Sequence, residues 1–284
     1  MGAKIFRVIM LWQAFLLLTP NLVCAHTVEQ HRRELIKKLS RNFGAEEVKN
    51  IFSDERLALD YGVLLPKPKK LTKAELEEAR KKEEERRKKF VSGDSLERGV
   101  KYFLEHKDML LNTSSASGVD PYIIVAILRV ETNFGKFLNE PMLAINAMYS
   151  NYVLRPKWRK FMLEEISCFL KTAKKNGWDI FSIYGSTAGA IGYPQFMPCS
   201  IEPFAVDSDS DGKIDLFSHA DAIASVAGHL KSRWSNRWQN QHKAVLGYNP
   251  DDGYRDYVLE YREALIREIF LRELKPKSDD GIQN

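Results

Sequence analysis

From residue 95 to residue 275 the sequence places apolar side chains at helical spacing, and it contains few of the alternating segments that form half-buried strands. This pattern limits the main body of the chain to a mostly α fold, because a sheet needs period-two segments to bury one face. Apolar residues make up 44% of the chain. That share is enough for a substantial hydrophobic core, and it excludes a disordered protein.

Residues 1–25 have the pattern of a secretory signal peptide. Lys4 and Arg7 precede an apolar run, and small residues lead up to a cleavage site after Ala25. The run is shorter than the roughly 20 residues that a membrane-spanning helix needs. We therefore expect export to the periplasm. Membrane association through an uncleaved leader or a lipidated Cys24 stays open.

Composition divides the rest of the chain into four segments. Residues 26–66 are expected to form a small helical lead-in, and residues 276–284 a polar tail. Residues 67–94 are almost wholly charged, with acidic and basic side chains four apart. This segment is a solvated helix or linker in one interpretation and a docking arm in the other. The main domain is expected at residues 95–275.

Charge and cysteine content narrow the classes of function. Lysine and arginine number 43 and aspartate and glutamate 38, a net charge of +5, so nothing favours a nucleic-acid partner. The three cysteines are too few for a disulfide-built scaffold, and they form no CxxC pair. Cys168 and Cys199 would remain after cleavage of the leader. In an exported protein they could form a disulfide or stay as two buried thiols, and the sequence leaves both alternatives open.

The helix predicted from Pro121 carries an acid where its apolar face should continue. Asp120 is a good N-cap and proline suits the first helical position. Ile124 and Leu128 lie on the apolar face, and the next residue on that face is Glu131. Burial penalises the charged form, so an acid there is suited to hold a proton at neutral pH and donate it. The alternative is a structural carboxylate that pairs with an arginine or a helix end.

A second segment, residues 185–198, combines three glycines and two prolines with small residues. The glycines let the backbone come close to a ligand, and Tyr193, Gln195 and Phe196 add ring faces and an amide. Ring faces and amides are the partners that sugars need. The segment lacks the GK[ST] ending of a phosphate loop.

A third motif, residues 207–215, has the pattern of a Ca²⁺-binding loop. Asp207, Asp209 and Asp211 stand at alternate positions before a turn glycine, as in an EF-hand. Position 12 is Ser218 in place of the usual glutamate. The alternative is a surface turn, although three alternating acids repel one another without a cation.

Taken together, residues 130–135 and 185–198 resemble the motifs of the membrane-bound lytic murein transglycosylase B family. The resemblance implies a lysozyme-like α core from about residue 95, with the N-terminal helical segment and the EF-hand-like loop added to it. Glu131 falls on the single catalytic acid of that family. In relatives, the positions of Ser186 and Gln195 contact the substrate or hold that acid, and Tyr193 lies beside them in the groove.

The same resemblance extends to the C-terminal part and to the metal loop. Tyr248, Asn249 and Tyr254 match an element that lines the saccharide cleft of the family. The family closes its metal site with a later acid, which implies Asp221 here, and with a backbone carbonyl from Lys213. We expect this Ca²⁺ to be structural. The sequence departs from the family at Pro194, where relatives commonly have glycine, so backbone contacts with sugar there are in doubt.

The implied activity is cleavage of peptidoglycan by one acid. Neither active-site motif holds a second carboxylate beside Glu131, whereas ordinary glycosidases use two. The resemblance implies that Glu131 acts as acid and then as base while the C6 hydroxyl of the sugar attacks, which forms 1,6-anhydromuramoyl ends. The alternatives are a hydrolytic muramidase of the same fold and a non-catalytic, Ca²⁺-stabilised glycan-binding module. We expect no organic cofactor and a monomer, and we leave open an association with an outer-membrane or cell-wall complex.

Overall fold

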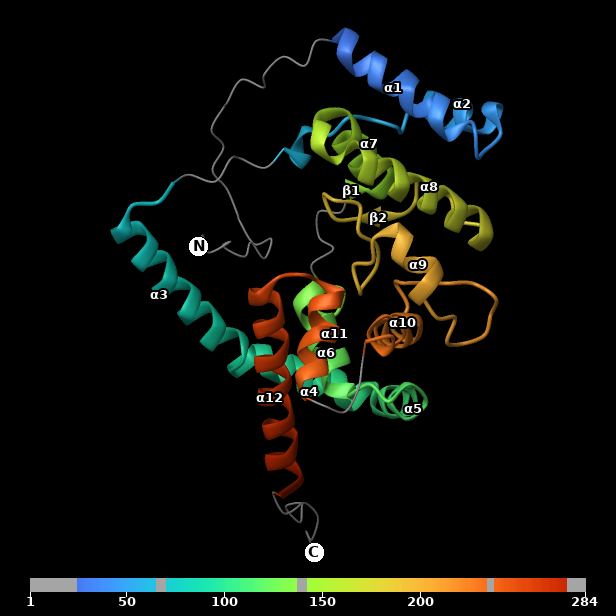
Figure 1. Ribbon diagram of the computed structural model, residues 1–284. Helices are drawn as coiled ribbons and strands as arrows, with labels where there is room; N and C mark the ends of the chain where they lie inside the picture. Colours follow the sequence, from blue (N-terminus) through green and yellow to red (C-terminus); the bar gives the residue numbers. More distant parts are fainter. Residues whose placement is uncertain (1–24, 65–69, 137–141, 234–237, 275–284) are drawn as a thin grey trace, which may run out of the picture. The chain divides into compact units, whose positions relative to one another are not determined.

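The fold of the described residues is mostly helical, as the sequence predicts (Figure 1). The computed structural model describes residues 25–64, 70–136, 142–233 and 238–274. Residues 1–24 of the predicted signal peptide and the predicted tail 276–284 lie outside the described residues. No helix within the described ranges combines the length and the apolar character that crossing a membrane requires.

The chain divides into two compact units, each built from two stretches of sequence. One unit comprises described residues of 69–130 and 230–284, and the other comprises described residues of 7–68 and 131–229. The predicted domain borders at residues 66, 94 and 275 remain predictions.

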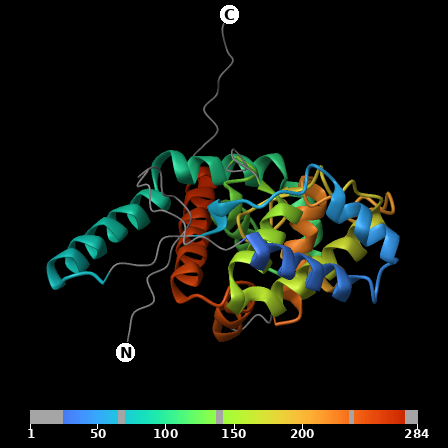
Figure 2. The same ribbon diagram turned by 90° about the horizontal axis from the view of Figure 1, so that it is seen from above.

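The unit that contains residues 131–229 is built around a central helix, α7 (Ala144–Leu154). Every residue of α7 except Asn146 is buried, so this helix is covered on all sides. It packs against α8, and α8 packs against α9. Figures 1 and 2 both draw α1 beside α7, in agreement with the contacts between them. The elements of this unit are α1 (Ala25–Leu39), α2 (Ala45–Ser53), η1 (Tyr61–Val63), β1 (Met142–Leu143), α7, η2 (Pro156–Trp158), α8 (Arg159–Asn176), β2 (Tyr184–Gly185), α9 (Pro198–Phe204) and most of α10 (His219–Lys231).

A short antiparallel pair places the glycine-rich segment beside α7. In this pair Met142 lies opposite Gly185, and Leu143 lies opposite Tyr184. Because α7 begins directly after β1, the start of residues 185–198 is fixed to the central helix of the unit.

The other unit packs α4 against both α3 and α12. Gly99 has no side chain where the ring of Tyr261 approaches, and the hydroxyl of Tyr261 donates to the backbone oxygen of Ser95 at 2.6 Å. Arg129 is 5% exposed; it donates to the Ser95 hydroxyl at 2.9 Å and lies over the ring of Phe90. Burial lowers the pKa of Arg129 to about 10. The elements of this unit are α3 (Lys73–Phe90), α4 (Gly93–Glu105), α5 (Lys107–Ser117), most of α6 (Pro121–Thr132), α11 (Trp238–Tyr248) and α12 (Asp252–Leu274).

The charged segment of the sequence contains helix α3, and none of its residues is buried. A capping box between Thr72 and Glu75 begins the helix. One face approaches α12, where the hydroxyl of Tyr257 donates to Glu83 at 2.6 Å. The part of the segment that forms α3 is therefore a solvated helix that also contacts its own unit.

Candidate active site

Glu131 lies in the last turn of α6, one residue before the helix ends at Thr132. The helix begins as predicted, with the side chain of Asp120 accepting a hydrogen bond from the Tyr122 backbone N–H at 2.8 Å. Ile124 and Leu128 are fully buried, and Glu131 is half-buried at the end of their face. The side chain of Glu131 therefore lies at the C-terminal end of the buried face of α6, where it is partly shielded from solvent.

The hydroxyl of Thr132 connects the end of α6 to the glycine-rich segment. It donates to the backbone oxygen of Tyr193 at 3.1 Å and accepts from the backbone N–H of Gly135 at 3.0 Å. Thr132 is 2% exposed. The backbone then turns sharply, because Asn133, Phe134 and Gly135 all have positive φ angles. This connection fixes the backbone next to Glu131 relative to Tyr193, and nothing in the sequence marks Thr132 for the role.

The ring of Tyr193 packs directly on Gly135. A Cβ atom at Gly135 would lie 2.4 Å from the Cε1 atom of Tyr193. The ring also packs against Phe217 and His219, with centroids 6.3 Å and 4.9 Å away. Burial raises the pKa of Tyr193, and the charge of Asp215 raises it further. Tyr193 is half-buried and keeps its proton at neutral pH, so it can act as a hydrogen-bond donor in the site.

Ser186 holds the first turn of the glycine-rich segment. Its hydroxyl oxygen accepts from the backbone N–H groups of Ala188 and Ala190, at 3.3 Å and 3.1 Å. Asn151, fully buried on α7, donates to the backbone oxygen of Thr187 at 2.8 Å. The segment is thus held both by Ser186, one of its own residues, and by Asn151 on the central helix. The sequence does not mark Asn151 for this role, because an asparagine in an apolar helix carries no signal for a distant partner.

Gln195 occupies a tight hairpin at the other end of the segment. Ile191 and Phe196 exchange backbone hydrogen bonds of 2.8 Å and 3.0 Å, and Gln195 adopts a left-handed backbone with φ of 51°. The side-chain N–H of Gln195 donates to the backbone oxygen of Gly192 at 2.8 Å. Pro194 lies buried within this hairpin. The amide oxygen of Gln195 can therefore accept a ligand hydroxyl while its nitrogen is engaged.

The C-terminal tyrosines lie in the unit that contains α11 and α12. Tyr248 and Tyr254 stack with ring planes 6° apart and centroids 6.4 Å apart. Tyr254 is 2% exposed, whereas Tyr248 and Asn249 are half-buried. Tyr254 thus supports the ring of Tyr248, and only Tyr248 and Asn249 present part of their surface to solvent.

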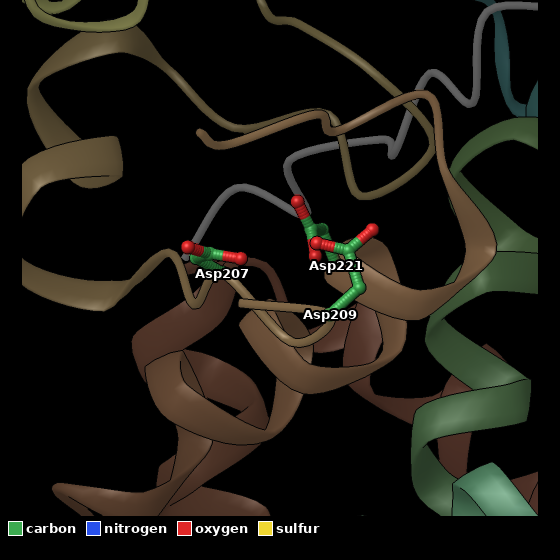
Figure 3. Close-up of side chains that lie close together, drawn as sticks. All are labelled: Asp207, Asp209 and Asp221. Atoms are coloured by element: carbon green, nitrogen blue, oxygen red, sulfur yellow. The ribbon is translucent and has the colours of Figure 1, made fainter. Parts of the chain in front are cut away.

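Three carboxylates of the metal loop gather in one place (Figure 3). One oxygen each from Asp207, Asp209 and Asp221 lies within 4.8 Å of the other two. Asp207 and Asp209 come from the loop, and Asp221 comes from the first turn of α10. Oxygen atoms in such a group are suitable ligands for a hard cation such as Ca²⁺.

Backbone N–H groups hold these carboxylates in position. Asp221 is 2% exposed, and its two oxygens accept from the backbone N–H groups of Ser208 and Asp215, each at 2.8 Å. The backbone N–H of Asp211 lowers the pKa of Asp209. The net pKa is nevertheless raised, because desolvation and the charges of Asp211 and Asp221 outweigh that bond. This mutual repulsion is what a cation relieves.

The remaining residues of the predicted metal set have other contacts. The Asp211 carboxylate accepts from the backbone N–H of Lys213 at 2.8 Å, and Asp211 is not part of the group of three. Ser218, at position 12 of the loop, accepts from the backbone N–H of Asp221 and so caps α10. The carboxylates that come together are therefore Asp207, Asp209 and Asp221.

Cys168 on α8 and Cys199 on α9 form a disulfide, with their Cα atoms 5.0 Å apart. The structure therefore resolves the two alternatives that the sequence left open. The disulfide closes a loop of 31 residues that contains the whole glycine-rich segment.

Known proteins are similar to this chain in sequence and in fold. The family model described as the transglycosylase SLT domain matches residues 27–265. The chain is also similar to membrane-bound lytic murein transglycosylase B of Escherichia coli (strain K12), with 37% identity over 148 residues. That match covers 51% of the chain and 40% of the relative, so the matched stretch spans less than half of the relative's length.

Solved structures share the fold over most of the chain. The soluble lytic transglycosylase SltB1 of Pseudomonas aeruginosa gives a TM-score of 0.72 at 23% identity, over 85% of this chain and 99% of that one. The Escherichia coli lytic transglycosylase Slt35 in complex with calcium gives 0.70 at 22%, over 84% and 93%. Pseudomonas aeruginosa SltB3 in complex with NAG-anhNAM-pentapeptide gives 0.72 at 18%, over 84% and 79%. These likenesses confirm the expected fold.

Proposed function

Because the chain belongs to the transglycosylase SLT domain family, we propose that it is a lytic transglycosylase that cleaves the glycan strands of peptidoglycan. The observation that carries the proposal is the end of α6. There a half-buried Glu131 follows a fully buried apolar face, and its neighbour Thr132 is bonded to Tyr193 of the glycine-rich segment. The complex of SltB3 with NAG-anhNAM-pentapeptide supports the choice of substrate.

In the proposed reaction Glu131 serves first as acid. It donates its proton to the glycosidic oxygen between N-acetylmuramic acid and N-acetylglucosamine, and the bond from that oxygen to C1 of the muramoyl residue breaks. The muramoyl N-acetyl group stabilises the cationic centre at C1.

Glu131 then serves as base. The C6 hydroxyl of the same sugar attacks C1, its proton passes to Glu131, and the product carries a 1,6-anhydro ring. No water is added, and Glu131 returns to its starting state. An intramolecular nucleophile needs less help than free water, so one carboxyl is sufficient.

The other residues of the set are assigned to binding. Ser186, Tyr193 and Gln195 would contact the sugar. Tyr248 and Asn249 are further predicted sugar contacts, and Tyr254 stacks on the ring of Tyr248. Half-buried aromatic rings suit the apolar faces of sugars, and amides suit their hydroxyls.

A Ca²⁺ ion is proposed for the metal loop, with a structural role. Asp207, Asp209 and Asp221 would hold it, since their oxygens already converge, and Asp211 and the Lys213 carbonyl are the further predicted ligands. Slt35 was solved in complex with calcium, which supports the choice of ion. When bound, the ion supplies charge neutralisation that ties the loop to α10. We further propose that the protein is exported and acts in the periplasm, as the sequence of residues 1–25 and the disulfide favour.

Digestion of purified peptidoglycan followed by mass spectrometry of the muropeptides tests the activity. We expect 1,6-anhydromuramoyl ends from the unaltered protein. Glu131→Gln should keep the fold and abolish cleavage, because the amide cannot donate a proton, whereas Glu164→Gln, an exposed control on α8, should cleave normally. Reducing ends would identify a hydrolytic muramidase, and no cleavage in the presence of glycan binding would identify a binding module. Cleavage by Glu131→Gln would overturn the assignment of the acid.

A further inference from the structure

Helix α9 begins at Pro198, the last residue of the glycine-rich segment, and its own side chains do not cap it. Its N-cap residue, Met197, makes no side-chain cap hydrogen bond, and Pro198 at the first helical position has no N–H. The first backbone N–H of the helix is therefore that of Cys199. An N–H in this place needs a partner from outside the helix.

Glu165, on the neighbouring helix α8, supplies that partner. Its Oε2 atom accepts from the backbone N–H of Cys199 at 2.9 Å, and Glu165 is 4% exposed. Burial raises the pKa of Glu165 more than this hydrogen bond lowers it. A carboxyl group buried at such a cost to its charged form is unusual unless it has a specific partner.

The same face of α8 holds α9 at two further points. Cys168, three residues after Glu165, forms the disulfide with Cys199. Lys171, another three residues on, pairs with Glu202 at 2.8 Å. The lysine pair is exposed on both sides and contributes little. Of these three attachments, the carboxyl group and the disulfide are the stronger, and both act at Cys199.

The fixed point at Cys199 is close to the proposed substrate contact. Gln195 lies four residues earlier, and Phe196 between them is 2% exposed and pairs both of its backbone groups with Ile191. The backbone between Gln195 and Cys199 is therefore restrained, and a shift at Cys199 would be passed on to Gln195. Gln195 also needs this support, because its own backbone is left-handed.

We propose that Glu165 is a positioning residue of the active site: by capping α9 at Cys199, it fixes the backbone that presents Gln195 to the glycan. The inference rests on the proposed function and adds a residue that touches no substrate. Misplacement of a contact group by about 1 Å can cost as much as a hundredfold in rate.

A double-mutant cycle on kcat/KM for muropeptide release tests the proposal. Glu165→Leu removes the acceptor, and we expect a loss on the order of tenfold or more. Glu165→Gln keeps an oxygen acceptor at the same place and should stay within about threefold of the unaltered protein. In a Gln195→Ala background, Glu165→Leu should cost almost nothing further, because the residue through which Glu165 acts is already gone.

Equal losses in both backgrounds, or no loss at all, would overturn the proposal. Glu164→Leu, which alters the exposed neighbour of Glu165, is the matched control and should leave activity unchanged. If Glu165→Leu does not fold, Glu165→Asp repeats the cycle, since it keeps the charge and withdraws the carboxylate from Cys199. Absence of anhydro products from the unaltered protein would instead refute the proposed function, so the two failures are distinct.

Discussion

At the scale of single residues, Gly135 and Tyr193 show how closely the two motifs of the site meet. The ring of Tyr193 occupies the space that a side chain at position 135 would need, and the backbone at Gly135 has φ of 85°. Both the contact with Tyr193 and the left-handed backbone therefore require glycine at position 135. A comparison of two variants separates these two effects.

Gly135→Ala should lower the free energy of unfolding by about 2–4 kcal/mol, the sum of left-handed strain and displacement of Tyr193. Gly177→Ala is the control, because Gly177 has φ of 66° and nothing lies within 4 Å of its added Cβ. That variant should lose only about 1 kcal/mol. Urea unfolding of the two variants measures the difference, and equal losses would show that Tyr193 does not resist displacement.

At the scale of secondary-structure elements, the disulfide is a covalent constraint that holds α9 against α8. It closes a loop of 31 residues, and in the chain-entropy model such a loop stabilises the folded state by about 3–4 kcal/mol. The double variant Cys168→Ala, Cys199→Ala should lose about that amount in denaturant unfolding. A change below about 1 kcal/mol would mean that the unfolded chain is already constrained in this region.

The attachment of α1 should depend on pH. His31 on α1 is 8% exposed, and its Nδ1 accepts from Arg159 at 3.1 Å, which requires a neutral ring. Burial lowers the pKa of His31, the charge of Arg159 lowers it further, and Glu34 opposes the shift. The unfolded chain therefore binds the proton more readily than the folded one. Stability contributed by this contact is present above pH 6.5 and is lost as the pH falls below it.

Thermal unfolding between pH 7.5 and pH 5 measures this dependence. His31→Asn keeps an acceptor near the position of Nδ1 and does not titrate, so its curve should fall less steeply over that interval. Parallel curves for the two proteins would assign the acid sensitivity to other groups.

At the scale of the whole molecule, bound Ca²⁺ should raise the stability of the entire folded state, because an ion that binds only the folded chain shifts the unfolding equilibrium. We expect EDTA to lower the melting temperature. At a Ca²⁺ concentration 100 times the dissociation constant, the gain is about 2.7 kcal/mol. Asp221→Asn should abolish the response to EDTA, since Asp221 is the buried member of the group. An unchanged melting curve for the unaltered protein would contradict the metal site.

The sequence predicts those parts of the molecule that depend on local patterns. The mostly α fold and the start of α6 at Pro121 follow from spacing and capping, which act within a few residues. The convergence of Asp207, Asp209 and Asp221 matches the loop motif together with the family resemblance. The roles assigned to Glu131, Ser186 and Gln195 remain predictions.

Contacts between distant residues could not be predicted. Thr132 bonds Tyr193 across 61 residues, Asn151 bonds Thr187 across 36, and Glu165 bonds Cys199 across 34. Each partner is an ordinary residue of its helix or loop, and only the packing of helices brings the pair within 3.1 Å or less. Pairing of Cys168 with Cys199 depends in the same way on a distance that spacing alone does not give.

The left-handed backbone of Asn133, Phe134 and Gln195 sets a limit on engineering of this chain. Selection of variants for heat resistance alone would favour glycine at all three positions, since each non-glycine residue there opposes folding. Two of them directly follow Thr132, and the third carries the amide proposed to bind the glycan. A laboratory lineage evolved toward thermostability would thus tend to lose the amide proposed to bind the glycan, and libraries should leave Gln195 untouched.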